Sequence, residues 1–93
     1  MADLQVTCII KPNIDSTHEH ITHLGGYGWL ATREKVIQNI ESKTDTFYVL
    51  DPINRRRSDV GVVRELGHNP YLRTYADGYY NNNLLSLDQC PTR

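Results

Sequence analysis

The chain has 93 residues, of which 39% are hydrophobic, and its formal net charge at pH 7 is -1. This length fits one modest hydrophobic core, so we predict a single domain over residues 1–93. The near-neutral charge excludes a strong overall attraction to nucleic acid or anionic membranes, because such attraction usually depends on a positive excess.

The N-terminal segment predicts a half-buried strand from Leu4 to Ile10, since apolar and polar residues alternate along it. It lacks a basic leader followed by a long apolar run, so we expect no signal peptide and no membrane anchor, and a cytoplasmic location. Cys8 and Cys90 form no metal-binding pair by spacing. In a reducing compartment we predict that both are free thiols.

A second strand is predicted from His18 to Leu24, forming a hairpin with the first strand. His18 and His20 would then share one face of that strand, about 7 Å apart, close enough to hold a zinc ion together. A third ligand would have to come from elsewhere, such as His68. Because zinc sites need three or four protein ligands, we predict no metal and no cofactor.

The segment GGYGW, which contains Tyr27 and Trp29, carries three glycines around two aromatic residues. This composition predicts a sharp backbone bend or a close approach to another segment. A helix follows over Thr32 to Ser42, with Thr32 as its N-terminal cap. Its apolar stripe consists of Val36, Ile37 and Ile40. A helix this short must dock on a sheet to be stable.

Three more strands are predicted in the second half of the chain: TFYVL, SDVGVVREL and the alternating segment from Tyr71 to Tyr75. Asp51, Pro52 and Asn54 indicate a turn between the first two of these strands. The element order β-β-α-β-β-β predicts an α+β fold, with a mostly antiparallel sheet of about five strands and one covering helix.

The C-terminal third contains the most distinctive pattern of the chain, YLRT, then the pair Asp77 and Gly78, then NNLLSL and Cys90. Together with GGYGW, KVIQNIES and FYV, it resembles DUF3892, a small bacterial family of uncharacterised proteins. Members of that family have a proline before the last cysteine, whereas Asp88 and Gln89 precede Cys90 here and Pro91 follows it. The resemblance implies one folded unit and no known activity.

The segment after Gly78 is the main candidate binding surface, with the residues Tyr79, Tyr80, Asn81, Asn82 and Asn83. Asparagines after such a turn commonly bond to backbone groups, so a structural role is the simpler hypothesis. Three amides beside two phenols nevertheless offer more donors and acceptors than a turn requires, and tyrosine is enriched at interfaces. We expect Leu84, Leu85 and Leu87 to fix this segment to the core.

Arg55, Arg56 and Arg57 lie in the predicted turn and are candidate phosphate contacts. With Tyr79 and Tyr80 as stacking surfaces, they suggest a nucleic-acid or nucleotide binder. Exposed arginines in a loop are more often solvated charges.

The sequence has no phosphate-binding loop, no G-x-G-x-x-G and no nucleophile motif, so we predict no enzyme and no catalytic residue. The leading hypothesis is a non-enzymatic module that binds an unidentified protein partner through GGYGW and the segment after Asp77. A nucleic-acid binder is the second hypothesis, and a metal-dependent enzyme using His18 and His20 is the third. The sequence predicts no particular oligomeric state.

Overall fold

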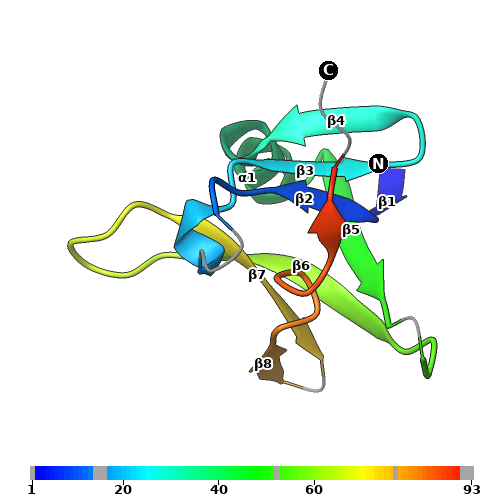
Figure 1. Ribbon diagram of the computed structural model, residues 1–93. Coiled ribbons are helices and arrows are strands. Elements are labelled where there is room, and N and C mark those ends of the chain that lie inside the picture. Colours follow the sequence, from blue (N-terminus) through cyan, green and yellow to red (C-terminus); the bar gives the residue numbers. More distant parts are fainter. Residues whose placement is uncertain (1, 14–16, 52, 77, 91–93) are drawn as a thin grey trace.

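The computed structural model describes residues 2–13, 17–51, 53–76 and 78–90, which fold into two β-sheets with one α-helix (Figure 1). The first sheet has the order β1 (Ala2–Gln5), β5 (Asp45–Leu50), β6 (Arg57–Val63), β7 (Tyr71–Ala76) and β8 (Tyr79–Asn81). The second sheet has the order β4 (Trp29–Thr32), β3 (His23–Gly26), β2 (Cys8–Ile10) and β9 (Asp88–Gln89). The helix α1 spans Arg33–Glu41, and a short 3-10 helix, η1, spans His18–His20.

The predicted fold class holds in its coarse form, because the described chain combines strands with a single α-helix and most strand pairs are antiparallel. The predicted single sheet is wrong. Two sheets are present in the described ranges, and the pairs β1–β5 and β2–β9 are parallel. Three strands were not predicted, namely β4, β8 and β9, each of which has four residues or fewer.

The chain changes sheets inside the predicted N-terminal strand. The backbone N–H of Val6 donates to Tyr48 O in the first sheet, at 2.8 Å, and that of Thr7 donates to Gly25 O in the second, also at 2.8 Å. The predicted continuous strand is therefore wrong, and its alternation breaks at this point. Ile9 is fully buried. Its neighbours Cys8 and Ile10, which the alternation predicts on the buried face, are only half-buried.

The predicted strand from His18 to Leu24 is wrong in its first half. There the backbone N–H of Ile21 donates to His18 O at 3.2 Å, which closes the turn of η1. The strand β3 starts only at His23 and pairs with β4. At the end of this hairpin a side chain at Gly26 would lie 2.2 Å from Gln5 O, which confirms the predicted close backbone approach.

The helix α1 lies where the sequence predicts it. The Thr32 hydroxyl accepts a hydrogen bond from the backbone N–H of Lys35 at 3.2 Å, which caps the first turn. Val36 and Ile37 are buried, and Ile40 packs against the core at its edge. The predicted apolar stripe is thus the face that docks on the sheets.

The three predicted strands of the second half correspond to β5, β6 and β7. The turn between β5 and β6 also forms as predicted, because Asp51 Oδ1 accepts from the backbone N–H groups of Ile53, at 2.8 Å, and Asn54, at 3.2 Å. Pro52 lies outside the described residues. Phe47 and Val49 on β5, like Leu72 on β7, point into the core.

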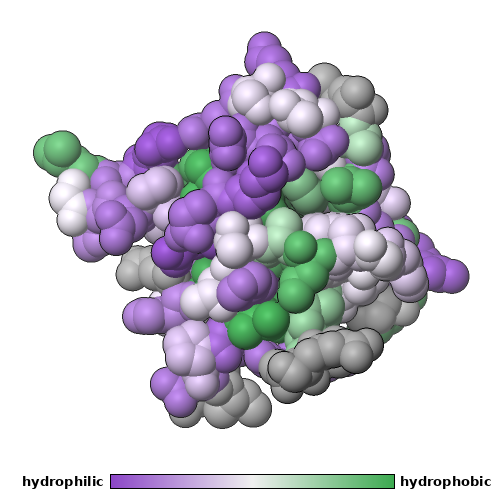
Figure 2. All heavy atoms as spheres, turned by 90° about the horizontal axis from the view of Figure 1, so that it is seen from above, coloured by the Kyte–Doolittle hydropathy of each residue, from purple (hydrophilic) through white to green (hydrophobic). Residues whose placement is uncertain are grey.

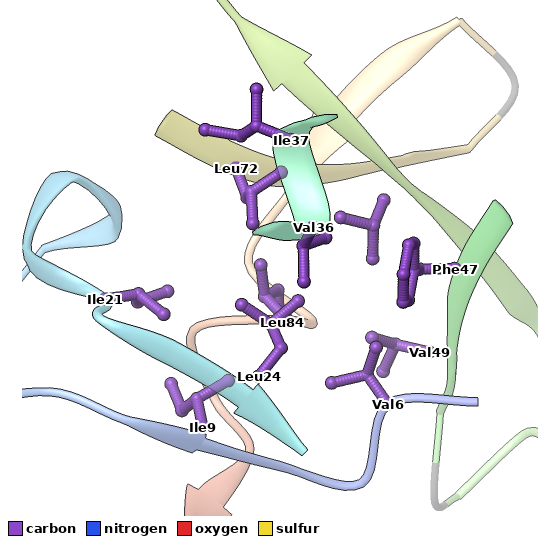
Figure 3. Close-up of a cluster of buried hydrophobic side chains, with 11 residues drawn as sticks. Val6, Ile9, Ile21, Leu24, Val36, Ile37, Phe47, Val49, Leu72 and Leu84 are labelled. Carbon is purple, nitrogen blue, oxygen red and sulfur yellow. The ribbon is translucent and has the colours of Figure 1, made fainter. Parts of the chain in front are cut away.

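The hydrophobic core lies between the two sheets and the helix (Figure 3). It is built from both sheets, from α1 and from the segment after β8, through Val6, Ile9, Ile21, Leu24, Val36, Ile37, Phe47, Val49, Val60, Leu72 and Leu84. Leu84 is fully buried, and Leu85 and Leu87 pack against this cluster. The prediction that the leucines fix the C-terminal segment to the core is confirmed. We call residues 82–90 the C-terminal strap.

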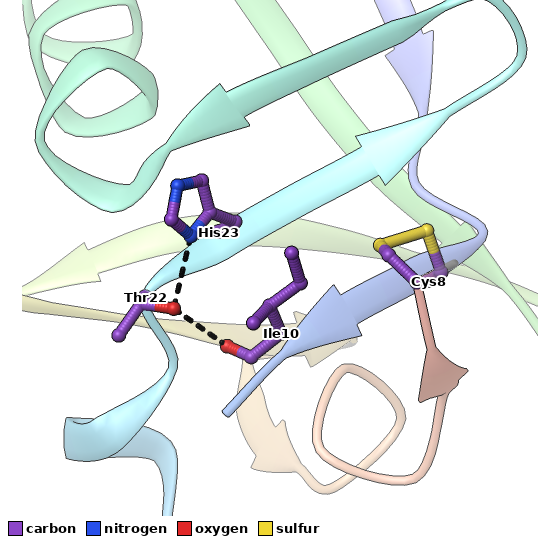
Figure 4. The surroundings of a disulfide bond; sticks show 5 residues. Cys8, Ile10, Thr22 and His23 are labelled. Atoms are coloured by element: carbon purple, nitrogen blue, oxygen red, sulfur yellow. Dashed lines mark hydrogen bonds between the residues drawn. A yellow bond between two sulfur atoms is a disulfide. The ribbon is translucent and has the colours of Figure 1, made fainter. Parts of the chain in front are cut away.

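The prediction of free thiols is wrong, because Cys8 and Cys90 form a disulfide with their Cα atoms 4.8 Å apart (Figure 4). The strap brings the two cysteines together. Its strand β9 pairs in parallel with β2, and the backbone N–H of Cys90 donates to Ile9 O at 2.8 Å. Gly25 leaves the room for the bond, since a Cβ there would lie 2.8 and 2.9 Å from the two sulfurs.

Replacing Ile37 with alanine is expected to lower the free energy of unfolding by about 2 kcal/mol, because the change removes buried methylene groups and leaves a cavity. The value lies at the low end for such changes because Ile37 keeps 7% of its surface exposed. Urea denaturation followed by circular dichroism measures it. Gln38→Ala, on the exposed face of the same helix, is the matched control. Equal effects of the two variants would contradict the docking of α1.

Candidate functional site

The asparagine segment mainly builds a partly buried hydrogen-bond network. Asn81 Oδ1 accepts from Thr74 Oγ1, at 2.6 Å, and from the backbone N–H of Asn83, at 3.0 Å. The side-chain amides of Asn81 and Asn83 both donate to Ser58 Oγ at 3.0 Å. Thr74 is fully buried and Ser58 is nearly so. Two of the three predicted binding amides therefore have structural bonds, which tie the strap to β6 and β7.

Asn82 differs from its neighbours because its side chain is exposed. Asn82 Oδ1 accepts a long hydrogen bond of 3.4 Å from Nη2 of Arg73, which belongs to β7. The Arg73 guanidinium also lies over the ring of Tyr80, with 5.1 Å between Cζ and the ring centroid. Arg73, Tyr80 and Asn82 thus form one continuous polar and aromatic surface on the β7–β8 hairpin.

The same hairpin displays three exposed tyrosines. Tyr79 is 78% exposed, Tyr80 58% and Tyr75 40%. Tyr75 and Tyr80 are direct partners across the hairpin and so lie on one face of the sheet. The Tyr75 ring covers Gly61, where an added Cβ would lie 2.8 Å from Cε1 of the ring. A hollow of about 270 Å³ is lined by Gly61, Val62, Tyr75, Gly78 and Tyr80.

The strand β8 is the outer strand at one end of the first sheet. The carbonyl of Asn81 faces β7, because it accepts from Thr74 Oγ1 at 3.3 Å. Backbone groups of successive residues in a strand point to opposite sides. The N–H and C=O of Tyr80 therefore face the edge of β8 on which no described strand lies, called the free edge below, where an extended chain could pair with them.

The other predicted surface, GGYGW, lies in the second sheet and far from β8 (Figure 1). Tyr27 is 79% exposed at the turn between β3 and β4. Trp29 is half-buried, and its ring packs against Phe47 with 5.5 Å between centroids. Seen from above, the molecule is mostly hydrophilic, and its apolar residues form only small groups (Figure 2). The structure therefore does not bring the two predicted surfaces together.

The three arginines of the β5–β6 turn do not act as one cationic tip. Arg57 bonds to Asp3 at 2.7 and 3.0 Å and to Asp59 at 2.8 Å. Its guanidinium also lies 4.3 Å from the ring centroid of Tyr48. Arg57 and the Thr46 hydroxyl lower the pKa of Asp3, while the two carboxylates raise the pKa of Arg57. The charge of Arg57 is thus neutralised within the fold.

Arg55 and Arg56 are exposed in the turn that precedes β6. The turn and the β7–β8 hairpin share a crevice of about 490 Å³, lined in part by Arg56, Tyr75 and Gly78. The structure therefore brings Arg56 next to Tyr75 of the hairpin, whereas Tyr79 and Tyr80, the stacking residues of the nucleic-acid hypothesis, are not among the residues that line this crevice. Asp51 and Asp59 line the same crevice and weaken its attraction for phosphate.

The two histidines of the H-x-H pair do not share a strand face, because η1 replaces the predicted strand there. His18 is buried, and this burial, helped by the charges of Arg73 and Lys11, lowers its pKa. His20 is exposed and lines a polar pocket with His68 and Arg33. Within the described ranges no three His, Cys, Asp or Glu side chains gather as a metal site would need.

Two residues of the candidate site, Arg73 and Tyr75, were not predicted from the sequence. Their signal was the alternation of Arg73 and Tyr75 with the buried Leu72 and Thr74, although Tyr71 at the start of the same strand is buried as well. That pattern places a cation and a phenol on one outward face of β7. The pattern indicates a binding surface only once β8, with Tyr80, is known to lie beside β7.

Comparison with known proteins gives a family but no activity. Residues 5–88 match the family described as "Protein of unknown function (DUF3892)". No curated protein and no solved structure was found to match the chain. No helix in the part of the chain that the structure describes is long and apolar enough to cross a membrane.

Proposed function

This chain belongs to the DUF3892 family of proteins of unknown function, and we propose that it is a non-enzymatic module that binds a protein partner through its β7–β8 hairpin. The observation that carries the proposal is the exposure of Tyr75, Tyr79 and Tyr80 beside the free edge of β8. Tyrosine provides a large contact area at a low cost in conformational entropy.

The hairpin is also well prepared for binding. The network of Asn81 with Ser58 and Thr74 holds β8 against the core, so the tyrosines are presented on a fixed backbone. A fixed surface loses less entropy when a partner binds. The GGYGW segment supports the proposal less. Trp29 packs onto the core, so Tyr27 is the one aromatic residue that this segment exposes fully.

We expect Tyr80→Ala to weaken binding of the partner by about 2 kcal/mol, roughly 30-fold, because truncating a buried interface tyrosine typically has this effect. The protein is immobilised, partners are captured from nuclease-treated native lysate, and the main captured protein is titrated against each variant. Tyr27→Ala is the matched control, since Tyr27 is 79% exposed on the other sheet. Equal affinity of both variants would contradict the proposed surface.

The nucleic-acid hypothesis remains the alternative, and the shared crevice of Arg56 and Tyr75 favours it. Phosphate binding releases counterions, so affinity for a single-stranded oligonucleotide would fall steeply as salt rises. It would also collapse when Arg55, Arg56 and Arg57 are replaced with alanine. We expect the arginine changes to leave the affinity for the partner nearly unchanged. The affinity of a partner held by the tyrosines should also depend little on salt concentration.

A further inference from the structure

Arg73 is the half-buried cation of the proposed surface. Arg57 and Arg64 are each bonded to a carboxylate, Arg57 to Asp3 and Arg64 to Glu41. No carboxylate among the described residues forms an ion pair with Arg73. Its Nε is buried and, within the same ranges, has no hydrogen-bond acceptor.

The described residues around Arg73 do not compensate its charge. Within the described chain its guanidinium contacts Asn82, through the long hydrogen bond, and the ring of Tyr80. His18 lies close enough for the charge of Arg73 to disfavour its protonated form, and His18 Nε2 is also buried without a described partner. A half-buried cation whose charge no described carboxylate offsets is unfavourable. An incoming carboxylate would relieve this, because arginine binds carboxylates through two parallel hydrogen bonds.

The position of Arg73 relative to β8 indicates how a carboxylate would arrive. The Arg73 side chain extends from β7 toward β8, since it contacts the side chains of Asn82 and Tyr80. An added strand beside β8 would lie about 4.8 Å from it, with alternate side chains on the face that carries Tyr80. A glutamate or aspartate on that face is within reach of the guanidinium.

We propose that the partner contributes an extended acidic segment, which pairs with the free edge of β8 at Tyr80 and places a carboxylate on Arg73. This inference rests on the proposed function and adds the chemistry of the partner to it. A peptide carboxylate fits better than a nucleic-acid backbone. A single uncompensated arginine matches one carboxylate, whereas a phosphate backbone would meet Asp51 and Asp59 in the neighbouring crevice.

The test uses short labelled peptides of alternating glutamate and valine, their glutamine–valine counterparts, and single-stranded oligothymidylate. Fluorescence anisotropy gives the affinities, and amide chemical shifts locate the contact. The glutamate peptide is expected to bind at least about tenfold more tightly than the glutamine peptide. It should shift the amides of Tyr79, Tyr80 and Asn81.

Arg73→Gln is expected to remove the preference for the glutamate peptide over the glutamine peptide. Arg73→Lys should keep part of this preference, because lysine retains the positive charge but lacks the planar guanidinium that forms two parallel hydrogen bonds. Arg64→Gln, which removes an exposed arginine already paired with Glu41, should change nothing. If Arg73→Gln fails to fold, as its melting curve would show, Arg73→Lys and the shift map of the wild type still decide the question.

Three results would overturn the inference: equal binding of both peptides, tighter binding of the oligonucleotide, or self-association of the chain through β8 in analytical ultracentrifugation. The proposed function fails separately. A partner from lysate that depends on Tyr80 but tolerates Arg73→Gln would keep the interaction surface and reject the acidic segment. Absence of any partner that depends on Tyr80 would reject both.

Discussion

Replacing Cys8 and Cys90 together with serine is expected to lower the free energy of unfolding by about 4.5 kcal/mol. The disulfide joins residues that are 82 positions apart, so it restricts almost the whole unfolded chain. In the chain-entropy model a loop of that length gives this value. A domain of this size has a total stability of about 5 to 14 kcal/mol, so the change removes a large part of it.

Urea denaturation of the oxidised protein, of the same protein in excess dithiothreitol and of the double serine variant measures this effect. The reduced protein and the serine variant should unfold at similar urea concentrations, both well below the oxidised protein. Dithiothreitol should not affect the serine variant, which is the control for other actions of the reductant. A loss below about 1 kcal/mol would contradict the stabilising role of the bond.

The disulfide also gives the predicted cytoplasmic location a direct test. Cytosolic thiols are generally kept reduced, whereas disulfides persist in oxidising compartments. Rapid alkylation of free thiols in intact cells, followed by mass spectrometry, reports the state of Cys8 and Cys90. Free thiols in the cell would agree with the predicted location. The protein in the cell would then fold without the stabilisation that the disulfide provides. A bonded pair would point to an oxidising compartment.

The parts of the fold that the sequence predicted correctly are those where a local pattern and tertiary packing agree. The helix α1 has its cap at Thr32 and its stripe at Val36 and Ile37, both of which act as expected. The strand β5 has a long apolar run, and the turn after it begins with Asp51. In each case the local pattern identifies the element, and packing against the core then stabilises it.

The change of sheet and the strand β9 were not predicted because contacts distant in sequence determine them. Nothing local marks the change of sheet between Val6 and Thr7, because both residues bond to strands far along the chain. The strand β9 has two residues and forms through pairing with β2, and this pairing in turn brings Cys90 to Cys8. Periodicity in sequence carries no signal for such short elements.

The candidate site follows the same rule. Sequence analysis selected Tyr79 and Tyr80 from their composition, and the structure leaves both exposed. It did not separate Asn82, which is exposed, from Asn81 and Asn83, which bond to Ser58. That distinction depends on β6, which lies more than twenty residues earlier in the chain.

The difference between the bonded Asn81 and the exposed Asn82 predicts a second large effect on stability. Asn81→Ala is expected to lower the free energy of unfolding by about 3 kcal/mol, since it removes the bonds to Thr74, Ser58 and the Asn83 backbone. The loss exceeds that of ordinary surface bonds because Thr74 is fully buried and Ser58 is 2% exposed, so water cannot replace the lost partner.

Asn82→Ala is the matched control, because Asn82 is exposed and makes a single long bond to Arg73. Its effect should stay within about half a kcal/mol, as for other exposed side chains. Urea denaturation of both variants in the oxidised state keeps the disulfide contribution constant. Hydrogen exchange should also show faster exchange in β8 for Asn81→Ala, because the network holds that strand to the core. Similar small losses for both variants would mean that the leucines of the strap, rather than the amides, keep β8 in place.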